Sequence, residues 1–144
     1  GGLRGQKYSL HEAGTRVPFI FSWPDKVKSP FVQKQNFTYL DMLSTFAGML
    51  ELPITIEEAN DTRDGSRLFL QADAPKYREY IMMQNNGGQI AIRKDNWKYI
   101  PATRNRGAEL YDLSTDPSEL RDVMMAYPEQ VAELKKYVER DYKK

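Results

Sequence analysis

The chain has 144 residues, a length that fits one compact domain or a small domain with part of another attached. Its 21 basic residues against 20 acidic ones leave a formal net charge of +1, so no global field draws it to nucleic acid or to an anionic membrane. No cysteine is present, which excludes disulfides, thiolate metal sites and cysteine nucleophiles. The apolar runs are far shorter than the roughly 18 residues of a membrane span, so we expect no membrane partner.

The N-terminal stretch GGLRGQKYSLHEAGTRVPFIFSWP is strongly patterned from its first residue. A glycine-rich bend carries Lys7, and the run VPFIFSW over residues 17–23 follows and stops at Pro24. A β-branched and aromatic run that is apolar on both faces predicts a strand inside a larger sheet. Such a strand needs neighbours on either side, so the sequence predicts that the chain is cut from a longer protein.

A helix is predicted next, over residues 36–52. Apolar residues recur there at helical spacing, Asn36 and Thr38 are both candidate N-caps, and Pro53 stops the pattern. The stretch that follows, as far as Pro75, is acidic and turn-rich, which is typical of a connection between two units. We therefore expect a domain boundary near residue 75.

Beyond that boundary, short strands and one helix are predicted. The strands lie over residues 79–84, 89–100 and 109–113. An Asn-Asn-Gly-Gly sequence between the first two has the composition of a hairpin turn. The closing helix has its apolar residues on one face, Pro128 near its first turn, and Lys143 and Lys144 at its end. This half of the chain predicts a small antiparallel sheet packed by a C-terminal helix, and the whole chain an α+β fold.

The candidate catalytic and ligand-binding residues lie in the first sixteen positions. Lys7 lies in a bend where glycines let the backbone approach a ligand, and its ammonium is a compact cation suited to an anionic oxyacid. His11 and Glu12 have the residue types of an acid and base pair, although a lone histidine is more often a structural hydrogen-bonding residue. Arg16 is expected to pair with Glu12 or another carboxylate and so fix the loop.

The segment DLSTDPSEL, residues 112–120, carries three acidic side chains. It lacks the alternating ligands, the central glycine and the terminal glutamate of a calcium-binding EF-hand loop. We interpret it as a turn at Asp116 and Pro117 that starts a helical stretch, with Glu119 in the first turn.

Several short blocks resemble the late part of the type I sulfatases. LRGQKYSLHEAGTRVPFIFSWP is similar to the family's LRGGKG stretch, YEGG-type turn, Arg-Val-Pro-Phe sequence and strand ending in Trp-Pro. FTYLDMLSTFAGMLELP, DGSRL, AIRKDNWKYI and ELYDLSTDPSEL are similar to further family blocks in the same order. Because the blocks cover nearly the whole chain, the resemblance is specific to this family of the alkaline-phosphatase-like superfamily.

The resemblance implies a division of the chain and a parent enzyme. Residues 1–75 would be the end of the α/β catalytic domain, with one or more core strands and a helix, and residues 76–144 the C-terminal subdomain. The parent would hydrolyse sulfate esters of small molecules or glycans with a formylglycine nucleophile and a calcium ion. The residues that supply both precede this segment in the family, so the chain alone would be inactive and would depend on the missing N-terminal catalytic domain. A periplasmic or secreted location is also implied.

One catalytic residue is carried over by the resemblance. Lys7 matches the family lysine that contacts the sulfate and steadies charge on the leaving oxygen. The sequence departs from the pattern at Gln6, Tyr8, His11 and Ala13, which stand for a glycine, a small residue, a tyrosine and a glycine. His11 therefore has two interpretations, as a residue that lines a substrate subsite or as a packing replacement for the tyrosine.

Two other functions are compatible with the sequence. A non-catalytic carbohydrate- or protein-binding module would use the NNGGQ turn and surface aromatic residues. A phosphonate or phosphate ester hydrolase would share the superfamily fold. Within the sulfatase hypothesis, the AIRKDNWKYIP stretch is similar to that of enzymes that act on sulfated amino sugars or galactose-type sugars.

Overall fold

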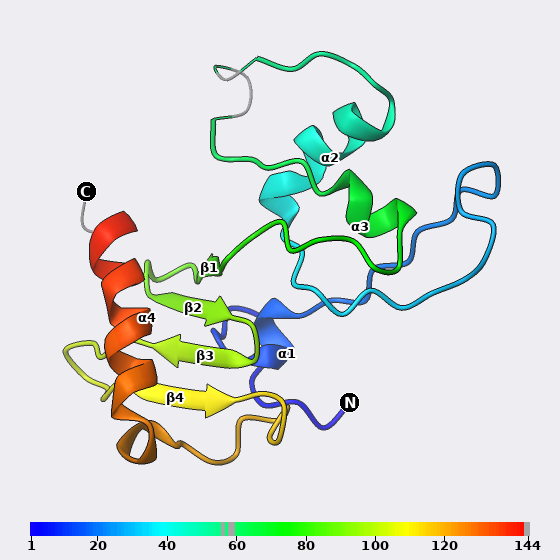
Figure 1. Ribbon diagram of the computed structural model, residues 1–144. Coiled ribbons are helices and arrows are strands. Elements are labelled where there is room, and N and C mark those ends of the chain that lie inside the picture. Colours follow the sequence, from blue (N-terminus) through cyan, green and yellow to red (C-terminus); the bar gives the residue numbers. More distant parts are fainter. Residues whose placement is uncertain (56, 58–59, 143–144) are drawn as a thin grey trace. The chain divides into compact units, whose positions relative to one another are not determined.

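The computed structural model describes residues 1–55, 57 and 60–142. Its contacts divide the chain into two compact units, Gly1–Pro18 with Tyr80–Lys144, and Phe19–Glu79. Figure 1 shows the helices and strands of each unit. The contacts thus group the first eighteen residues with the C-terminal half, whereas the sequence predicts a boundary near residue 75. The domain boundaries of the longer protein stay a prediction.

Four antiparallel strands form the sheet of the first unit, in the order β1-β2-β3-β4. They are β1 (Ile81–Gln84), β2 (Ile90–Lys94), β3 (Trp97–Ile100) and β4 (Glu109–Asp112). The single strand predicted over residues 89–100 is therefore two strands, joined by a two-residue turn between the paired Lys94 and Trp97. Asp95 in that turn has a φ of 52°, a left-handed conformation that aspartate tolerates better than most residues.

The hairpin predicted between β1 and β2 is confirmed, with Gln84 paired to Ile90 across its base. The Asn85 side chain organises the turn, because its Oδ1 accepts hydrogen bonds from the backbone N–H groups of Gly87 and Gln89 at 3.0 and 2.9 Å. This is the local side-chain bonding that makes asparagine a turn residue.

Helix α4 (Pro128–Asp141) packs across one face of this sheet (Figure 1). Leu134 is fully buried and Val138 nearly so. They form one apolar cluster with the strand residues Ile90, Ile92, Tyr99 and Leu110. The predicted closing helix is confirmed, including Pro128 in its first turn. Lys143 and Lys144 lie outside the described residues.

The N-terminal segment covers the opposite face of the same sheet. Successive strand residues point to opposite faces, so the neighbours of the residues that contact α4 point away from it. Leu10 packs there in a second apolar cluster, with Ala91, Ile100, Tyr111 and Leu113. The short helix α1 (Glu12–Thr15) lies behind the strands in Figure 1, on the side away from α4. The sheet is therefore covered on both faces, by α4 and by residues 1–18.

The second unit contains the 3-10 helix η1 (Tyr39–Asp41) and the helices α2 (Met42–Met49) and α3 (Ser66–Leu70). The helix predicted over residues 36–52 is thus formed in its centre, and it follows Thr38 without a side-chain cap. The fully buried Asp41 accepts hydrogen bonds from the Arg78 guanidinium and the Arg63 backbone N–H. Edge-on ring contacts join Phe19, Phe21, Phe37 and Phe69 into an aromatic cluster.

The strand predicted over residues 17–23 is not formed in this structure. Ile20 is 92% exposed, and Val17 and Phe19 are exposed as well. A strand is defined by hydrogen bonds to a neighbouring strand, and within the described part of the chain no strand pairs with this stretch. The prediction rested on neighbouring strands of a larger sheet, and the four strands of the described residues pair with one another.

The helical stretch predicted after Asp116 and Pro117 is also wrong, because the backbone makes turns there. Glu119 has a φ of 55°, which a right-handed helix does not contain. The next helical turn is the 3-10 helix η2 (Met124–Ala126), which leads into α4.

Candidate functional site

Lys7 lies on a closed loop at the edge of the first unit, which we name the Lys7 loop (residues 4–13). The backbone N–H of Ala13 donates a hydrogen bond to the carbonyl of Arg4 at 2.9 Å and joins the two ends of the loop. The Lys7 side chain is exposed. The loop therefore presents a cation to the outside from a closed backbone ring.

The turn that carries Lys7 is tight. The backbone N–H of Ser9 donates to the carbonyl of Gln6 at 2.9 Å, so Lys7 and Tyr8 occupy the two central positions. Tyr8 has a φ of 73°, a conformation that costs a non-glycine residue roughly 1–2 kcal/mol. The sulfatase pattern has a small residue at this position, glycine in its LRGGKG form, and glycine adopts a positive φ without this cost. The Lys7 ammonium lies 5.0 Å from the centre of the Tyr8 ring, within cation–π range.

Two glycines let the loop fold this closely. Gly5 has a φ of 93°, and a Cβ built there would overlap the Ser9 hydroxyl. A Cβ on Gly14 would lie 2.6 Å from the carbonyl oxygen of Gln6 and closer still to that of Ser9. Because these obstacles at position 14 are backbone atoms, a side chain there must displace the loop itself.

Gly14→Ala is therefore expected to destabilise the chain by about 1–3 kcal/mol, the usual cost of forcing a side chain into filled space. Chemical denaturation of the 144-residue chain measures this free energy of unfolding. Gly107→Ala is the matched control, because no atom beyond the two adjacent residues lies within 4 Å of a Cβ built there. Equal stabilities of the two variants would contradict the close packing at Gly14.

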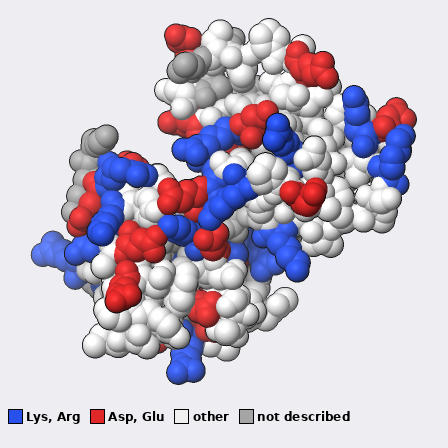
Figure 2. Space-filling view, viewed as in Figure 1, with Lys and Arg blue, Asp and Glu red and all other residues white. Residues whose placement is uncertain are grey.

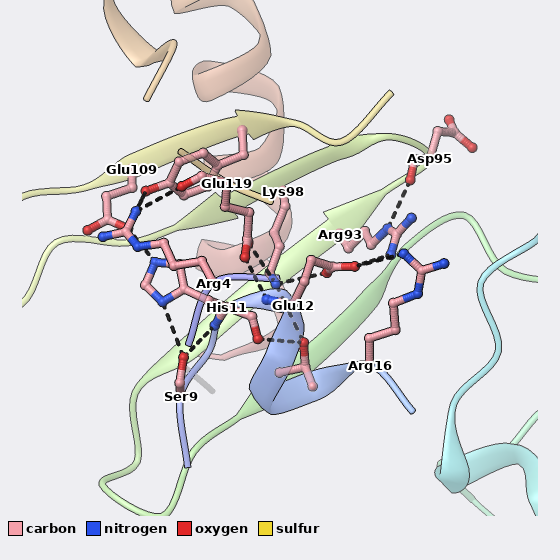
Figure 3. Close-up of polar contacts among 12 residues, drawn as sticks. Arg4, Ser9, His11, Glu12, Arg16, Arg93, Asp95, Lys98, Glu109 and Glu119 are labelled. Carbon is pink, nitrogen blue, oxygen red and sulfur yellow. Dashed lines mark hydrogen bonds and ion pairs between the residues drawn. The ribbon is translucent and has the colours of Figure 1, made fainter. Parts of the chain in front are cut away.

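His11 is buried at the base of the Lys7 loop, and both of its ring nitrogens have partners (Figure 3). Nδ1 lies 3.2 Å from the Ser9 hydroxyl, and Nε2 lies 3.1 Å from a carboxylate oxygen of Glu109 on β4. A carboxylate only accepts hydrogen bonds, so we assign the hydrogen to Nε2, with Nδ1 accepting from Ser9 in the neutral ring. The ring also meets Tyr111 edge-on, with the centroids 6.0 Å apart. These contacts favour the packing interpretation of His11 over a substrate subsite.

Glu12 belongs to a different network, which we name the buried ion triad (Glu12, Lys98 and Glu119). The Lys98 ammonium, on β3, lies 3.0 Å from Glu12 Oε1 and 2.9 Å from Glu119 Oε1. The second oxygen of Glu119 accepts a hydrogen bond from the backbone N–H of Glu12 at 2.5 Å. The contact between Lys98 and Glu119 is an ion pair without hydrogen-bond alignment. All three side chains are almost completely buried.

Two arginines complete the charge balance around Glu12. Arg93 on β2 lies 3.4 Å from Glu12 Oε2, and burial lowers the pKa of its guanidinium while Glu12 opposes that shift. Arg16 lies 3.8 Å from the same oxygen, which confirms the predicted pairing of Arg16 with Glu12. Glu12 thus has three cations beside it and Glu119 has one, as burial of charge requires.

Arg4 ties the beginning of the loop to the far edge of the sheet. Its Nη1 donates to the Tyr111 hydroxyl at 2.7 Å and to the Glu119 carbonyl at 3.0 Å. The Tyr111 hydroxyl donates in turn to Glu109 at 2.8 Å. Burial raises the pKa of the Tyr111 hydroxyl, and its hydrogen bond to Glu109 raises it further. The loop is therefore held by contacts from β4 and from the segment that follows it.

The arrangement presents one group that could take part in chemistry, the exposed Lys7 ammonium, on a loop whose buried side is held in place by hydrogen bonds and ion pairs. Such a group can bind an anion or stabilise developing negative charge without rearrangement. Among the described residues, no group of three or more histidine, aspartate or glutamate side chains is placed to hold a metal ion. The buried carboxylates of Glu12 and Glu119 are already paired with cations, so they do not fit a calcium site.

The residues that sequence reasoning missed are Lys98 and Glu119. Both have residue types that are mostly exposed in folded proteins. The alternation Trp-Lys-Tyr-Ile of β3 was the available signal for Lys98, since that strand packs on both faces. No local signal marks Glu119, because its partners are distant in sequence.

The viewed surface carries no large area of one charge sign. Figure 2 shows lysine and arginine interspersed with aspartate and glutamate, which agrees with the formal net charge of +1. Of the helices among the described residues, none combines the length and apolar character needed to cross a membrane.

Comparison with known proteins places the chain in a family. Residues 5–144 match the family described as N-sulphoglucosamine sulphohydrolase, C-terminal, and the chain belongs to this family of sulfatase C-terminal regions. The match confirms the resemblance to sulfatases noted from the sequence and agrees with the α+β fold.

Individual relatives are sulfatases from bacteria and animals. The chain is 40% identical to an N-acetylgalactosamine-6-O-sulfatase of Bacteroides thetaiotaomicron, over 96% of its own length and 30% of the relative. It is 29% identical to arylsulfatase K of Gallus gallus, over 90% of its length and 26% of the relative. A solved Bacteroides thetaiotaomicron structure, described under the metabolism of multiple glycosaminoglycans, has a TM-score of 0.86 and 36% identity. That match covers 99% of this chain and 32% of the other.

The chain thus spans about a third of the length of the proteins it matches. It corresponds to their C-terminal part, since the matching family describes a C-terminal region.

Proposed function

We propose that the longer protein containing this chain is a sulfatase that hydrolyses a sulfate ester on a carbohydrate. The observation that carries this proposal is the 40% identity to an N-acetylgalactosamine-6-O-sulfatase over 96% of the chain. The substrate class we propose is a sulfated amino sugar of the glycosaminoglycan type, with the ester on the 6-oxygen. A periplasmic or secreted location, implied by the sulfatase resemblance, is part of the proposal.

In this proposal Lys7 is a catalytic residue. Its ammonium would contact the sulfate and stabilise negative charge that develops on the oxygen leaving the sulfur. A fixed cation does this more effectively than water, because it does not have to reorient during the reaction. The exposed position of Lys7 on the closed loop supports this role. A formylglycine and a calcium ion in the N-terminal catalytic domain would supply the nucleophile and a second positive charge.

The exposed apolar residues of the second unit support an N-terminal catalytic domain as a partner of this chain. Leu43, Phe46 and Leu50 recur at helical spacing on α2 and its C-terminal end, and all three are exposed. Ile20 and Val32 are exposed as well. Exposed apolar residues that recur along one helix face favour an interface. About two thirds of each relative lies outside the matched region, which leaves enough protein to cover it.

The experiment is to measure sulfate release from N-acetylgalactosamine 6-sulfate by the longer protein, with the 6-phosphate compound and the 144-residue chain alone as comparisons. We expect sulfate release by the longer protein, slower release of phosphate, and no turnover by the chain alone. Faster phosphate release would favour a phosphate ester hydrolase, and glycan binding without turnover would favour a binding module. Turnover by the chain alone would contradict the view that the nucleophile lies outside it.

A further inference from the structure

The Lys7 loop is attached to the sheet through a cluster of charges that the proposed reaction does not itself use. Glu12, inside the loop, lies next to Lys98 on β3 and Glu119 after β4 (Figure 3). These residues are 86 and 107 positions away from Glu12 in the sequence. The triad therefore joins three separate segments of the first unit at one point.

The contacts of the triad fix the backbone of the loop as well as a side chain. Glu119 Oε2 accepts the backbone N–H of Glu12 at 2.5 Å, while its other oxygen is 2.9 Å from the Lys98 ammonium. The Glu12 side chain returns to the same ammonium at 3.0 Å. Lys98 thus pairs with both carboxylates, and the Glu119 carboxylate also accepts a hydrogen bond from the loop backbone at Glu12, five residues after Lys7.

A buried ion pair is a poor device for stability alone. Removing charges from water is costly, and apolar residues of the same volume often stabilise a core as well or better. A charge triad differs from apolar packing because its two hydrogen bonds, from the Lys98 ammonium to Glu12 and from the Glu12 backbone N–H to Glu119, are directional and define one arrangement of the groups. Leu10 and the second apolar cluster already supply apolar packing beside the triad. Because the apolar cluster already stabilises this part of the sheet, we infer that the charges of the triad serve to fix the position of the loop.

We propose that the buried ion triad positions the Lys7 loop on the C-terminal sheet and so sets the place of the Lys7 ammonium in the active site. Lys98 and Glu119 are then positioning residues that act through Lys7. This inference rests on the proposed function, because it assumes that Lys7 acts in catalysis. Its structural part, that the triad orders the loop, does not depend on any activity.

The first measurement is amide hydrogen exchange in the longer protein carrying Lys98→Met. Without the ammonium, Glu12 and Glu119 repel each other, and the Glu12 amide should exchange at least about tenfold faster, with β2 and β3 changing by less than about threefold. Lys94→Met is the matched control: Lys94 is on β2, and its ion pair with Glu133 and hydrogen bond to Tyr137 face α4. Unchanged exchange at Glu12 in Lys98→Met would overturn the proposal.

The second measurement separates positioning from general damage by a double-mutant cycle in kcat. Lys98→Met should lower kcat about tenfold with KM changed less than about threefold, since the loss falls on transition-state contacts. In a Lys7→Ala background the same substitution should lower kcat by less than about twofold, because its effect passes through Lys7. A tenfold loss in both backgrounds would overturn the positioning role.

Glu119→Gln keeps the proposal testable if Lys98→Met does not fold. The amide retains the shape of the side chain and leaves Glu12 paired with Lys98, so we expect a smaller acceleration of exchange at the Glu12 amide and the same dependence on Lys7. An effect of Glu119→Gln on kcat that persists without Lys7 would overturn the proposal. If Lys7→Ala alone has no effect on kcat, the catalytic role of Lys7 fails, whereas the exchange results still decide whether the triad orders the loop.

Discussion

Replacing Lys7 by alanine in the longer protein is expected to lower kcat for sulfate-ester hydrolysis about a hundredfold, the usual cost of deleting a group that stabilises an oxyanion. The reason is the loss of a fixed positive charge next to the leaving oxygen. The loop should survive the change, because Lys7 is exposed and the loop is closed by backbone hydrogen bonds. Steady-state kinetics on N-acetylgalactosamine 6-sulfate measure the effect.

Lys26→Ala is the matched control for this experiment. Lys26 is also an exposed lysine whose ammonium lies near an aromatic ring, 5.9 Å from the centre of the Trp23 ring. Its removal should leave kcat within about twofold, as expected of an exposed charge to which no role in the reaction is assigned. A kcat for Lys7→Ala within about threefold of the unmodified protein would remove Lys7 from the catalytic residues.

Leu134→Ala is expected to destabilise the chain by about 3 kcal/mol, within the 2–5 kcal/mol usual for deleting a buried leucine side chain. Leu134 is 0% exposed at the centre of the cluster between α4 and the sheet. The vacated space cannot close easily, because strand residues and Val138 surround it. Urea denaturation of the chain should show a lower midpoint with an unchanged slope.

Leu120→Ala is the control for the core substitution. Leu120 has the same side chain but is 80% exposed, so its truncation should change stability by less than about 0.5 kcal/mol. Similar midpoints for the two variants would show that α4 does not depend on its contact with the sheet.

The C-terminal sheet and helix were predictable because their signals are local. The turn sequence after Gln84 and the apolar face of α4 depend on residues a few positions apart. The predicted strand over residues 17–23 failed for the opposite reason, since strand pairing needs distant partners. The split between β2 and β3 was missed because the turn at Asp95 lacks glycine and proline.

The candidate site was predictable in part. The site role of Lys7 is a prediction from the family resemblance. A pairing of Arg16 with Glu12 or another carboxylate was also predicted, and the structure shows the pair with Glu12, across one helical turn. The position of Glu119 was not predictable, because a charged residue in a turn-rich segment ordinarily faces water. Only the fold brings Glu119 next to the backbone of Glu12 and turns an apparent surface charge into an internal one.

The way residues 1–18 cover the sheet has a consequence for exchanging parts between related sulfatases. A C-terminal module cut at residue 75 would leave one face of the sheet bare, exposing Ala91, Ile100 and Tyr111 to water. It would also separate Lys98 from Glu12 and leave it with Glu119 alone. The loop and the sheet therefore have to be exchanged together, although the 61 residues Phe19–Glu79 of the other compact unit separate them in the sequence. A chimaera that takes both from one parent preserves the core and the charge balance.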